Sequence, residues 1–426
     1  MLDRRDIEIV LSEQKTEISR KAKSVLCRRK EESLINLNST MAQIVIGVRR
    51  SGKSTLCFQA LHHAGVSFAY VNFDDERLVD TTTEDLNVIL EVLYKIYGDF
   101  THLFLDEIQN VQGWHLFVNR LLRQGIKILV TGSNAKLLSS ELATHLTGRH
   151  TTIELYPFSF REFCNLKQIE TDTLTTQAEG LRRAAFDEYL KQGGFPELIN
   201  EPGNKKYVSE LVAGILQRDI KQRYNVRYYA AFEQMANHLM NIAPAILAPA
   251  ELTELFDFKT AQTTHNYINY LKQAYLLIGI SKYSAKSRLR VRDEKIYTVD
   301  VSIMDKRPDA HAGENLGWRL ETVVYAELMR RRQFEDYDIY YYKKHSRAKE
   351  VDFVLCQGNK ICRMYQVAYD ISNPKTLKRE IDSLIIASQA TGCKELYLIT
   401  DHERKIIKNN ELTINILPAH EWLLTE

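Results

Sequence analysis

The chain has few cysteines, no long apolar run and almost no net charge, and each absence excludes a class of protein. Its six cysteines are scattered without any CxxC spacing, which argues against a structural zinc site and a disulfide framework. No apolar stretch approaches the roughly 18 residues of a membrane-spanning helix. The net charge is only +2, so nothing attracts nucleic acid globally, and any such contact must come from local patches.

The length and the first residues add to this picture. At 426 residues the chain is too long for one hydrophobic core and suggests two to four domains. The opening segment MLDRRDIEIVLSEQK carries charges where a secretory signal would be apolar. No spacing typical of a serine, cysteine and histidine triad occurs. We therefore expect a soluble, cytoplasmic, multidomain protein without a membrane partner.

What the sequence does contain is a glycine-rich loop, GVRRSGKST, directly after the apolar run QIVI. The loop matches the phosphate-binding pattern at every constrained position, and its glycines let backbone N–H groups wrap an anion. Lys53 would add a positive charge for the β- and γ-phosphates, and Ser54 would offer a hydroxyl to Mg²⁺. A chance glycine turn is the alternative, which the flanking strand and helix disfavour. The pattern predicts ATP and Mg²⁺ as cofactors, with the nucleotide bound by Gly47, Val48, Arg49, Arg50, Ser51, Gly52, Lys53, Ser54 and Thr55.

A second motif, HLFLDEIQN, begins at His102 and indicates what the nucleotide is for. Its apolar part is typical of a buried parallel strand, and Asp106 falls at the strand end, where open α/β sheets place their ligands. Together with Ser54, Asp106 is the predicted magnesium ligand. Glu107 is the natural base to orient an attacking water, which favours a hydrolase over a small-molecule kinase. An ordinary acidic strand end is the alternative.

Asn134, in the segment LVTGSNA, ends another apolar strand and is a third catalytic candidate. Its amide could sense the γ-phosphate or hold the attacking water. It could equally cap the helix that follows, as turn amides commonly do.

These motifs resemble those of bacterial and archaeal AAA-type P-loop ATPases of the additional-strand class, whose C-terminal half carries a nuclease-like region. The resemblance spans most of the chain. It rests on the two motifs above and on the segments YVNFDDERL, VTGSNA, LTGRH, LYPFSFREF and GGFPE. It implies that Arg149 of LTGRH lies near the nucleotide as a candidate arginine finger, in the same chain or from a neighbouring subunit of a homo-oligomer. A surface salt bridge is the alternative for Arg149.

The order of patterns along the chain predicts the fold class and the domains. Strand and helix patterns alternate after residue 40, as in a parallel sheet wrapped by helices, and helical periodicity dominates later. We expect an α/β protein with a P-loop parallel sheet and a helical lid, then a winged-helix domain and a restriction-endonuclease-like α/β domain. The boundaries are 1–40 for a helical segment, 41–170 for the ATPase core, 171–227 for the lid, 228–306 for the winged helix and 307–426 for the nuclease-like domain.

The expected winged helix contains two helical segments, APAELTELF and AQTTHNYINYLKQAYLL, followed by a hairpin pattern. Alternation in the hairpin places Arg288, Arg290 and Arg292 on one side, where they are candidate DNA phosphate contacts. A structural or protein-docking role is the alternative.

The last hundred residues resemble the restriction-endonuclease fold through Glu321 on a helix and Asp352 on a strand. In that fold two acids hold Mg²⁺ and a lysine activates water. Here the third element reads Gln366-Val367-Ala368, so an amide replaces the carboxylate and alanine replaces the lysine. Lys360 is a conceivable substitute without positional support. We therefore expect a nuclease-like domain that is inactive.

Three functions remain open. The first is a hydrolysing ATPase whose nucleotide state moves the C-terminal modules. The second is a nucleotide-gated switch that binds DNA or protein with negligible turnover. The third, disfavoured by Ala368, is an ATP-gated nuclease.

Overall fold

The computed structural model describes residues 3–21, 27–133, 146, 148–201, 203–204, 206–284, 293–304, 315–343, 350–409 and 411–425. The chain divides into two compact units, Met1–Leu155 and Tyr156–Glu426. The five-part division expected from the sequence stays a prediction. Within the described ranges, no helix has both the length and the apolar character needed to cross a membrane.

The first unit is built on a five-stranded sheet in the order β2-β3-β4-β1-β5, with every neighbouring pair parallel. β4 lies between β1 and β3. Parallel strands place all their carboxyl ends at one edge of the sheet. The strands are β1 Ala42–Ile46, β2 Phe68–Asn72, β3 His102–Asp106, β4 Lys127–Gly132 and β5 His150–Glu154.

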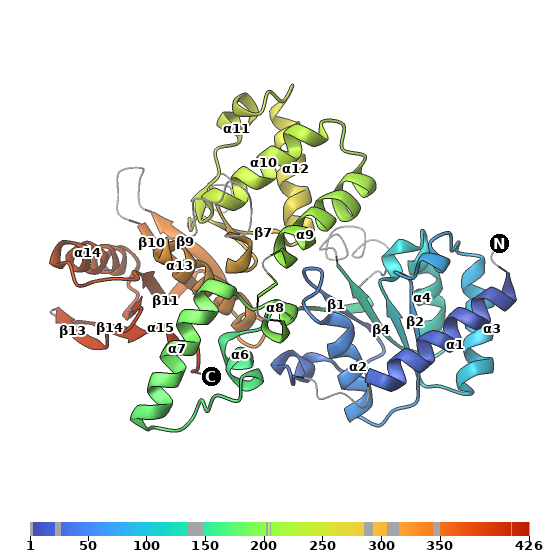
Figure 1. The fold of residues 1–426 in the computed structure, drawn as a ribbon. Coiled ribbons are helices and arrows are strands. Elements are labelled where there is room, and N and C mark those ends of the chain that lie inside the picture. Colours follow the sequence, from blue (N-terminus) through green and yellow to red (C-terminus); the bar gives the residue numbers. More distant parts are fainter. Residues whose placement is uncertain are drawn as a thin grey trace. The chain divides into compact units, whose positions relative to one another are not determined.

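Helices surround this sheet (Figure 1). α2 contacts β1 and β4, whereas α1 and α3 contact each other and β2. Apolar residues of α1 and α2 form a buried cluster with the strands, including Ile18, Leu56 and Leu129. The helices are α1 Arg4–Lys21, α2 Lys53–His63, α3 Asp85–Tyr97 and α4 Trp114–Arg123, with short 3₁₀ turns η1 Lys30–Leu34, η2 Glu76–Leu78 and η3 Ile108–Asn110.

The second unit begins with helices, including the region expected to be a lid. α7 contacts α6, α13 and α15. The guanidinium of Arg319 is fully buried and donates hydrogen bonds to the carbonyls of Leu190 and Lys191 at 3.1 and 3.3 Å. The helices are α6 Phe160–Leu166, α7 Thr176–Gln192, α8 Pro196–Asn200, α9 Tyr207–Gly214 and the π-helix η5 Ile215–Gln222. The expected lid therefore shares a compact unit with the C-terminal elements.

Three helices and a small antiparallel sheet, ordered β6-β8-β7, follow in the second unit. The helical segment expected over residues 261–277 is shorter than predicted. α12 ends at Gln273, Tyr275 has a positive φ of 56°, and Leu277 begins β7. The elements are α10 Tyr229–Ile242, β6 Ala245–Ile246, α11 Pro249–Leu255, α12 Ala261–Gln273, β7 Leu277–Ser281, β8 Glu294–Thr298 and η7 Val301–Met304.

The second unit ends in a mixed six-stranded sheet, ordered β13-β14-β12-β11-β10-β9. α14 packs against β10, β11 and β12, and α13 contacts β8 and β11 (Figure 1). The register of β10 against β9 and β11 is antiparallel, so the start of β10 lies beside the end of β11. The elements are α13 Leu316–Arg331, β9 Asp338–Lys343, β10 Glu350–Gln357, β11 Lys360–Val367, α14 Pro374–Thr391, β12 Glu395–Thr400, β13 Lys405–Asn409, β14 Leu412–Pro418 and α15 Ala419–Trp422.

Candidate nucleotide site

The glycine-rich loop connects β1 to α2, and both of its glycines are required by geometry. A Cβ on Gly47 would lie 2.0 Å from the carbonyl oxygen of Leu155, so no other residue fits there. Gly52 has a left-handed φ of 94° and precedes α2 without offering a side-chain cap. No described atom lies within 4 Å of the position that a Cβ on Gly52 would take. The N–H groups of the first turn of α2 are thus presented as in anion-binding helix ends.

Lys53 and Arg49 hold the loop together through charged contacts. The Lys53 ammonium is buried and donates to the carbonyls of Gly47 and Val48 at 3.1 and 3.0 Å. The guanidinium of Arg49 forms an ion pair of 2.7 Å with Asp74, which follows β2. In the rest of the loop, Val48 and Ser51 are buried, Ser54 and Thr55 are half-buried, and Arg50 is exposed with a positive φ of 69°.

Asp106 lies at the end of β3 with its carboxylate turned toward the loop. Its Oδ1 accepts hydrogen bonds from Ser54 Oγ at 2.9 Å and from the Thr131 hydroxyl, and its Oδ2 accepts one from Tyr70 Oη at 3.1 Å. Burial raises the pKa of Asp106, as does the neighbouring charge of Glu107, whereas the three hydroxyl donors lower it. A buried carboxylate with neutral donors keeps an unbalanced negative charge.

Glu107 follows directly, in a left-handed conformation with a φ of 53°. Its backbone N–H donates to the Thr131 hydroxyl at 3.2 Å. Its carboxylate accepts from the N–H and hydroxyl of Ser133 at 3.2 and 3.1 Å and from the side-chain amide of Gln109. The ends of β3 and β4 thus place Asp106 and Glu107 side by side, with only the aspartate bonded to the loop.

These residues fit a nucleoside triphosphate with Mg²⁺. The loop provides an uncapped helix end and an ammonium, which suit phosphate. Ser54 and Asp106 provide adjacent hydroxyl and carboxylate oxygens, the hard ligands that Mg²⁺ prefers. Asp106 makes no ion pair within the described part of the chain, so the negative charge there has not been neutralised internally.

The structure does not bring every predicted residue to this site. Arg149 is exposed and lies beside the start of β1, where its carbonyl accepts from the N–H of Ala42. The loop follows the other end of β1, five residues along, or about 16 Å at 3.3 Å per residue. That distance exceeds the length of an arginine side chain. Asn134 lies outside the described residues, as do Arg288, Arg290 and Arg292.

Three residues at the site were missed in the sequence. The Arg29 guanidinium is buried and donates to the carbonyl of Ser51 at 3.2 Å, which supports the loop from the N-terminal segment. Tyr70 and Thr131 contribute hydroxyls to Asp106. Thr131 could have been recognised because it lies near the end of an apolar strand, as Asn134 was. Arg29 and Tyr70 carry no comparable signal.

Several polar side chains of α12 are exposed. Gln262, His265 and Asn266 are exposed on α12, whereas Thr263 is half-buried. Ile268 and Leu271 of α12 are buried, and so is Tyr275 beyond the end of the helix. The structure thus leaves this face accessible to a partner.

Asp352 and Gln366 come together, but Asp352, which the sequence pattern predicts at the end of its strand, lies elsewhere in it. Asp352 is the third residue of β10, near its start rather than its end. It still lies beside Gln366 because β10 and β11 run antiparallel, and its N–H donates to the amide oxygen of Gln366 at 3.3 Å. Lys360 begins β11, six residues or about 20 Å before Gln366. Lys360 is therefore remote from the carboxylates.

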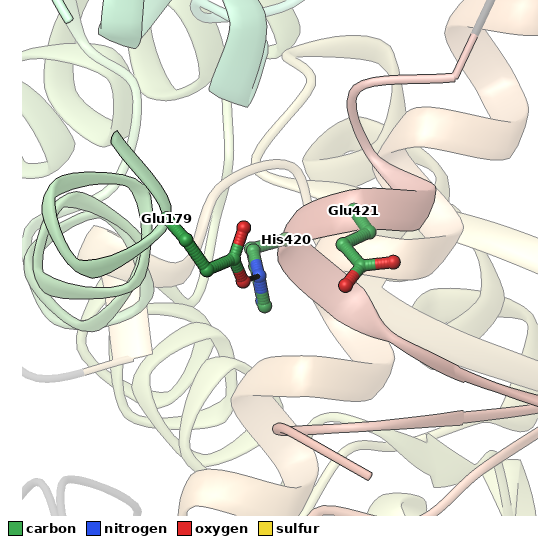
Figure 2. Close-up of side chains that lie close together, drawn as sticks. All are labelled: Glu179, His420 and Glu421. Atoms are coloured by element: carbon green, nitrogen blue, oxygen red, sulfur yellow. Dashed lines mark hydrogen bonds and ion pairs between the residues drawn. The ribbon is translucent and has the colours of Figure 1, made fainter. Parts of the chain in front are cut away.

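One further group of possible metal ligands, among the described residues, consists of Glu179 on α7 with His420 and Glu421 on α15 (Figure 2). His420 Nε2 lies 2.7 Å from Glu179 Oε1. Arg182 and Arg183 also bind Glu179, at 2.9 and 3.2 Å, and Arg404 binds Glu421.

The three arginines determine whether this group can bind a cation. Burial alone would raise the pKa of Glu179, yet hydrogen bonds from Arg182 and His420 lower it to about 2. Three guanidinium groups outweigh two carboxylates, so the local charge repels a divalent cation. Among these contacts, the one between His420 and Glu179 joins α15 to α7 within the second unit.

Three domain families match the chain. Residues 39–164 match the family described as AAA domain. Residues 183–307 match "Domain of unknown function (DUF8612)", and residues 316–422 match "Domain of unknown function (DUF4143)". The winged-helix and nuclease-like interpretations therefore stay predictions.

Whole-chain relatives are also found. "Uncharacterized protein MJ1544" of Methanocaldococcus jannaschii is 32% identical over 442 residues, covering 100% of this chain and 97% of that protein. An uncharacterized protein of Haemophilus influenzae is 28% identical over 355 residues, covering 80% of this chain and 86% of that protein. Among solved structures, the Walker-type ATPase PABY2304 of Pyrococcus abyssi is 14% identical with a TM-score of 0.40, covering 65% of this chain and 95% of that chain.

The parallel sheet, the glycine-rich loop and the AAA match together define the first unit as a P-loop domain of the AAA type. The prediction of this fold is confirmed. Because the M. jannaschii protein is 32% identical over nearly its whole length, the chain belongs to the same family as that protein.

Proposed function

We propose that the chain binds ATP with Mg²⁺ and hydrolyses it, and that the nucleotide state moves the C-terminal modules. The observation that carries this proposal is the 2.9 Å hydrogen bond from Ser54 Oγ to Asp106 Oδ1. It joins the phosphate loop to the strand end through the two oxygen ligands that a magnesium nucleotide requires.

Each side chain has a defined task in this proposal. Lys53 moves its ammonium from the loop carbonyls to the β- and γ-phosphates. Ser54 and Asp106 hold Mg²⁺, which when bound neutralises charge on the phosphate oxygens. Glu107 orients the attacking water and accepts its proton. Asn134 is the candidate sensor of the γ-phosphate.

Arg149 takes part in this proposal only from a neighbouring copy of the chain. Within one chain it lies at the opposite edge of the sheet from the loop. Its exposure leaves the guanidinium accessible to a second nucleotide site. A homo-oligomer in which subunits meet at the nucleotide would therefore place Arg149 as an arginine finger in trans.

The modules that respond to the nucleotide are the lid at 171–227, the winged helix at 228–306 and the nuclease-like domain at 307–426. DNA contact through Arg288, Arg290 and Arg292, together with the exposed face of α12, is part of this proposal. The expected signature is a weak and salt-sensitive interaction, because phosphate contacts release counterions.

A second candidate function is a nucleotide-gated switch with negligible turnover. The observation that favours it is the engagement of the Glu107 carboxylate by Ser133 and Gln109. All three hydrogen bonds end on Oε2, so they hold the carboxylate in one orientation that an attacking water would have to match through Oε1.

Phosphate release with Mg²⁺ and ATP, with and without DNA, tests the proposal against a Lys53→Ala variant. Turnover that disappears in the variant would support an ATPase, and stimulation by DNA would support the DNA contact. Equal trace release from both proteins, while wild type still binds ATP, would reject hydrolysis in favour of the switch.

A further inference from the structure

A lysine from the small sheet enters the acidic cluster of the second unit. Lys295 lies on β8, and its ammonium is 2.7 Å from Glu321 Oε1 on α13 and 2.8 Å from Glu350 Oε1 on β10. Asp352 Oδ1, also on β10, lies 3.7 Å away. Lys295 is only 7% exposed and Asp352 equally so. Three carboxylates from two elements thus surround one buried ammonium.

Two of these acids also accept hydrogen bonds from groups other than lysine. Glu321 Oε1 also accepts from the Tyr297 hydroxyl at 2.7 Å. Asp352 Oδ2 accepts from the backbone N–H of Val367 at 2.9 Å. The amide group of Gln366 donates to Glu380 at 2.8 Å, so this side chain is directed into the sheet and α14.

The resemblance to restriction endonucleases implies Mg²⁺ between Glu321 and Asp352, and the residues present do not fit it. Mg²⁺ requires near-octahedral oxygen ligands at 2.0–2.1 Å. The ammonium already lies between the carboxylates that would supply them, and a lysine ammonium beside a divalent cation would add strong repulsion in a buried site. Gln366, in the place of the third ligand, is held by Glu380 and Asp352.

We infer that Lys295 is the resident cation of this carboxylate cluster, and that its ammonium takes the place of the metal ion and excludes divalent metals. The lysine comes from β8, outside the nuclease-like domain expected at 307–426, so it binds the small sheet to α13 and β10.

The electrostatic environment keeps the lysine charged. Burial alone would lower the pKa of Lys295, but Glu321, Asp352 and Glu350 together raise it far above its usual range. The ammonium makes ion pairs with Glu321 and Glu350 at 2.7 and 2.8 Å, so Lys295 acts here as a counter-ion to the acids. Burial and the Glu321 charge raise the pKa of Asp352, which Lys295 partly opposes.

Aromatic packing holds this position rigidly. The ring of Tyr297, two residues along β8 on the same face, lies 4.4 Å from that of Tyr325, which stacks on Phe353 at 5.6 Å. The hydroxyl of Tyr325 donates to the carbonyl of Gly279 on β7 at 2.8 Å. β8 is therefore fixed against α13 and β10 independently of the ion pairs, and Lys295 can be truncated without displacing its strand.

The test is Mn²⁺ binding to nucleotide-free protein, measured by electron paramagnetic resonance, which makes it independent of ATP hydrolysis. Lys295→Ala should bind one more Mn²⁺ per chain than wild type, and adding Asp352→Asn should abolish that extra site. Lys343→Ala is the matched control, because Lys343 lies 3.7 Å from the other oxygen of Glu350 at the margin of the cluster, and it should bind as wild type does.

Failure to gain a site in folded Lys295→Ala would overturn the inference. A second comparison does not depend on that variant folding. Glu321→Gln and Asp352→Asn, each made in the wild-type background, should leave the Mn²⁺ stoichiometry unchanged. Loss of a bound Mn²⁺ in either variant would show that the wild-type cluster holds metal and would reject the inference.

Discussion

Asp106 and Asp352 are both buried aspartates beside a nearby lysine, yet their surroundings prepare them for different partners. Asp106 accepts hydrogen bonds from three hydroxyl groups, while Lys53 donates to the carbonyls of its own loop. Asp352 lies in a cluster whose lysine makes ion pairs with the acids themselves. The first arrangement leaves a negative charge for an external cation, whereas the second supplies its cation internally.

The difference shows that similar residue types do not specify similar chemistry. Neutral donors orient a carboxylate and partly offset the cost of burying it without cancelling its charge. An ammonium within ion-pair distance cancels charge and occupies the space as well. The availability of a buried aspartate for a metal therefore depends on whether the nearby lysine makes an ion pair with it.

The largest expected effect is on ATP hydrolysis at the site that contains Asp106. Glu107→Gln should reduce phosphate release by about 100- to 10,000-fold, because the amide cannot accept the proton of water. ATP binding should persist, since the loop and Asp106 are unchanged. Glu91→Gln, on the exposed surface of α3, is the matched control and should retain wild-type turnover. Turnover within a few-fold of wild type in Glu107→Gln would remove this residue from the mechanism.

The next prediction tests the cluster in which Lys295 is paired with Glu321, Glu350 and Asp352. Lys295→Met should lower the free energy of unfolding of the second unit by about 3–5 kcal/mol, because it leaves buried carboxylates without their cation. Trp318 and Trp422 report on this unit by fluorescence during denaturation, provided that Trp114 of the first unit is replaced by phenylalanine.

Lys343→Met is the control for that measurement, because it removes a less buried lysine from the same glutamate. It should cost less than about 1 kcal/mol, as expected for a partly exposed pair. Equal losses of unfolding free energy in the two variants would show that the ion pairs of Lys295 contribute no more than a partly exposed pair does. The contrast with Asp106 would then disappear.

The sequence predicted the first site far better than the second, because the first site is built from motifs that can each be recognised without the other. The phosphate loop is a contiguous motif, and Asp106 and Glu107 are adjacent at a strand end, so local rules suffice. The parallel sheet of the first unit was predicted from the alternating pattern of strands and helices. Tyr70 and Thr131 were missed because their roles depend on which strands become neighbours.

Lys295 was missed for a related reason. The hairpin was interpreted as a solvent-facing surface because of Arg288, Arg290 and Arg292. Lys295 and Tyr297 instead share a face of β8 that contacts α13. The alternating Lys-x-Tyr pattern was the available signal. This pattern could not reveal the acidic partners of Lys295, because Glu321 and Asp352 lie on other elements and no recognisable motif links them to β8.

A smaller effect would sharpen the description of Asp106. Tyr70→Phe removes one hydroxyl donor but keeps the ring against Phe104, and it should cost about 1–3 kcal/mol while Asp106 is charged. In an Asp106→Asn background the cost should shrink, because the acceptor no longer carries a charge. Denaturation of the four proteins in a double-mutant cycle measures this coupling. Tyr94→Phe, an exposed tyrosine of the same unit, is the control.

The raised pKa of Asp106 also predicts how the stability of the first unit depends on pH. Because the folded-state pKa lies above the unfolded value, the native state binds the proton more tightly, and stability falls as the pH rises through that interval. Asp106→Asn should therefore raise the stability of the nucleotide-free first unit at neutral pH. A fall in stability would mean that the hydroxyl donors outweigh the cost of burying the charge.

The smallest expected effect concerns Glu179, a carboxylate that is paired with arginines rather than with hydroxyl groups or a lysine. Burial lowers the pKa of the partner His420, with Glu179 partly opposing the shift, so the unfolded chain takes up a proton first as the pH falls below about 6.5. Stability should decrease between pH 7.5 and 5.5, and His420→Gln should flatten this slope because an amide does not titrate. His402→Gln, at an exposed histidine of the same unit, should leave the slope intact. An unchanged slope in His420→Gln would mean that the proton of His420 does not contribute to the pH dependence of stability in this range.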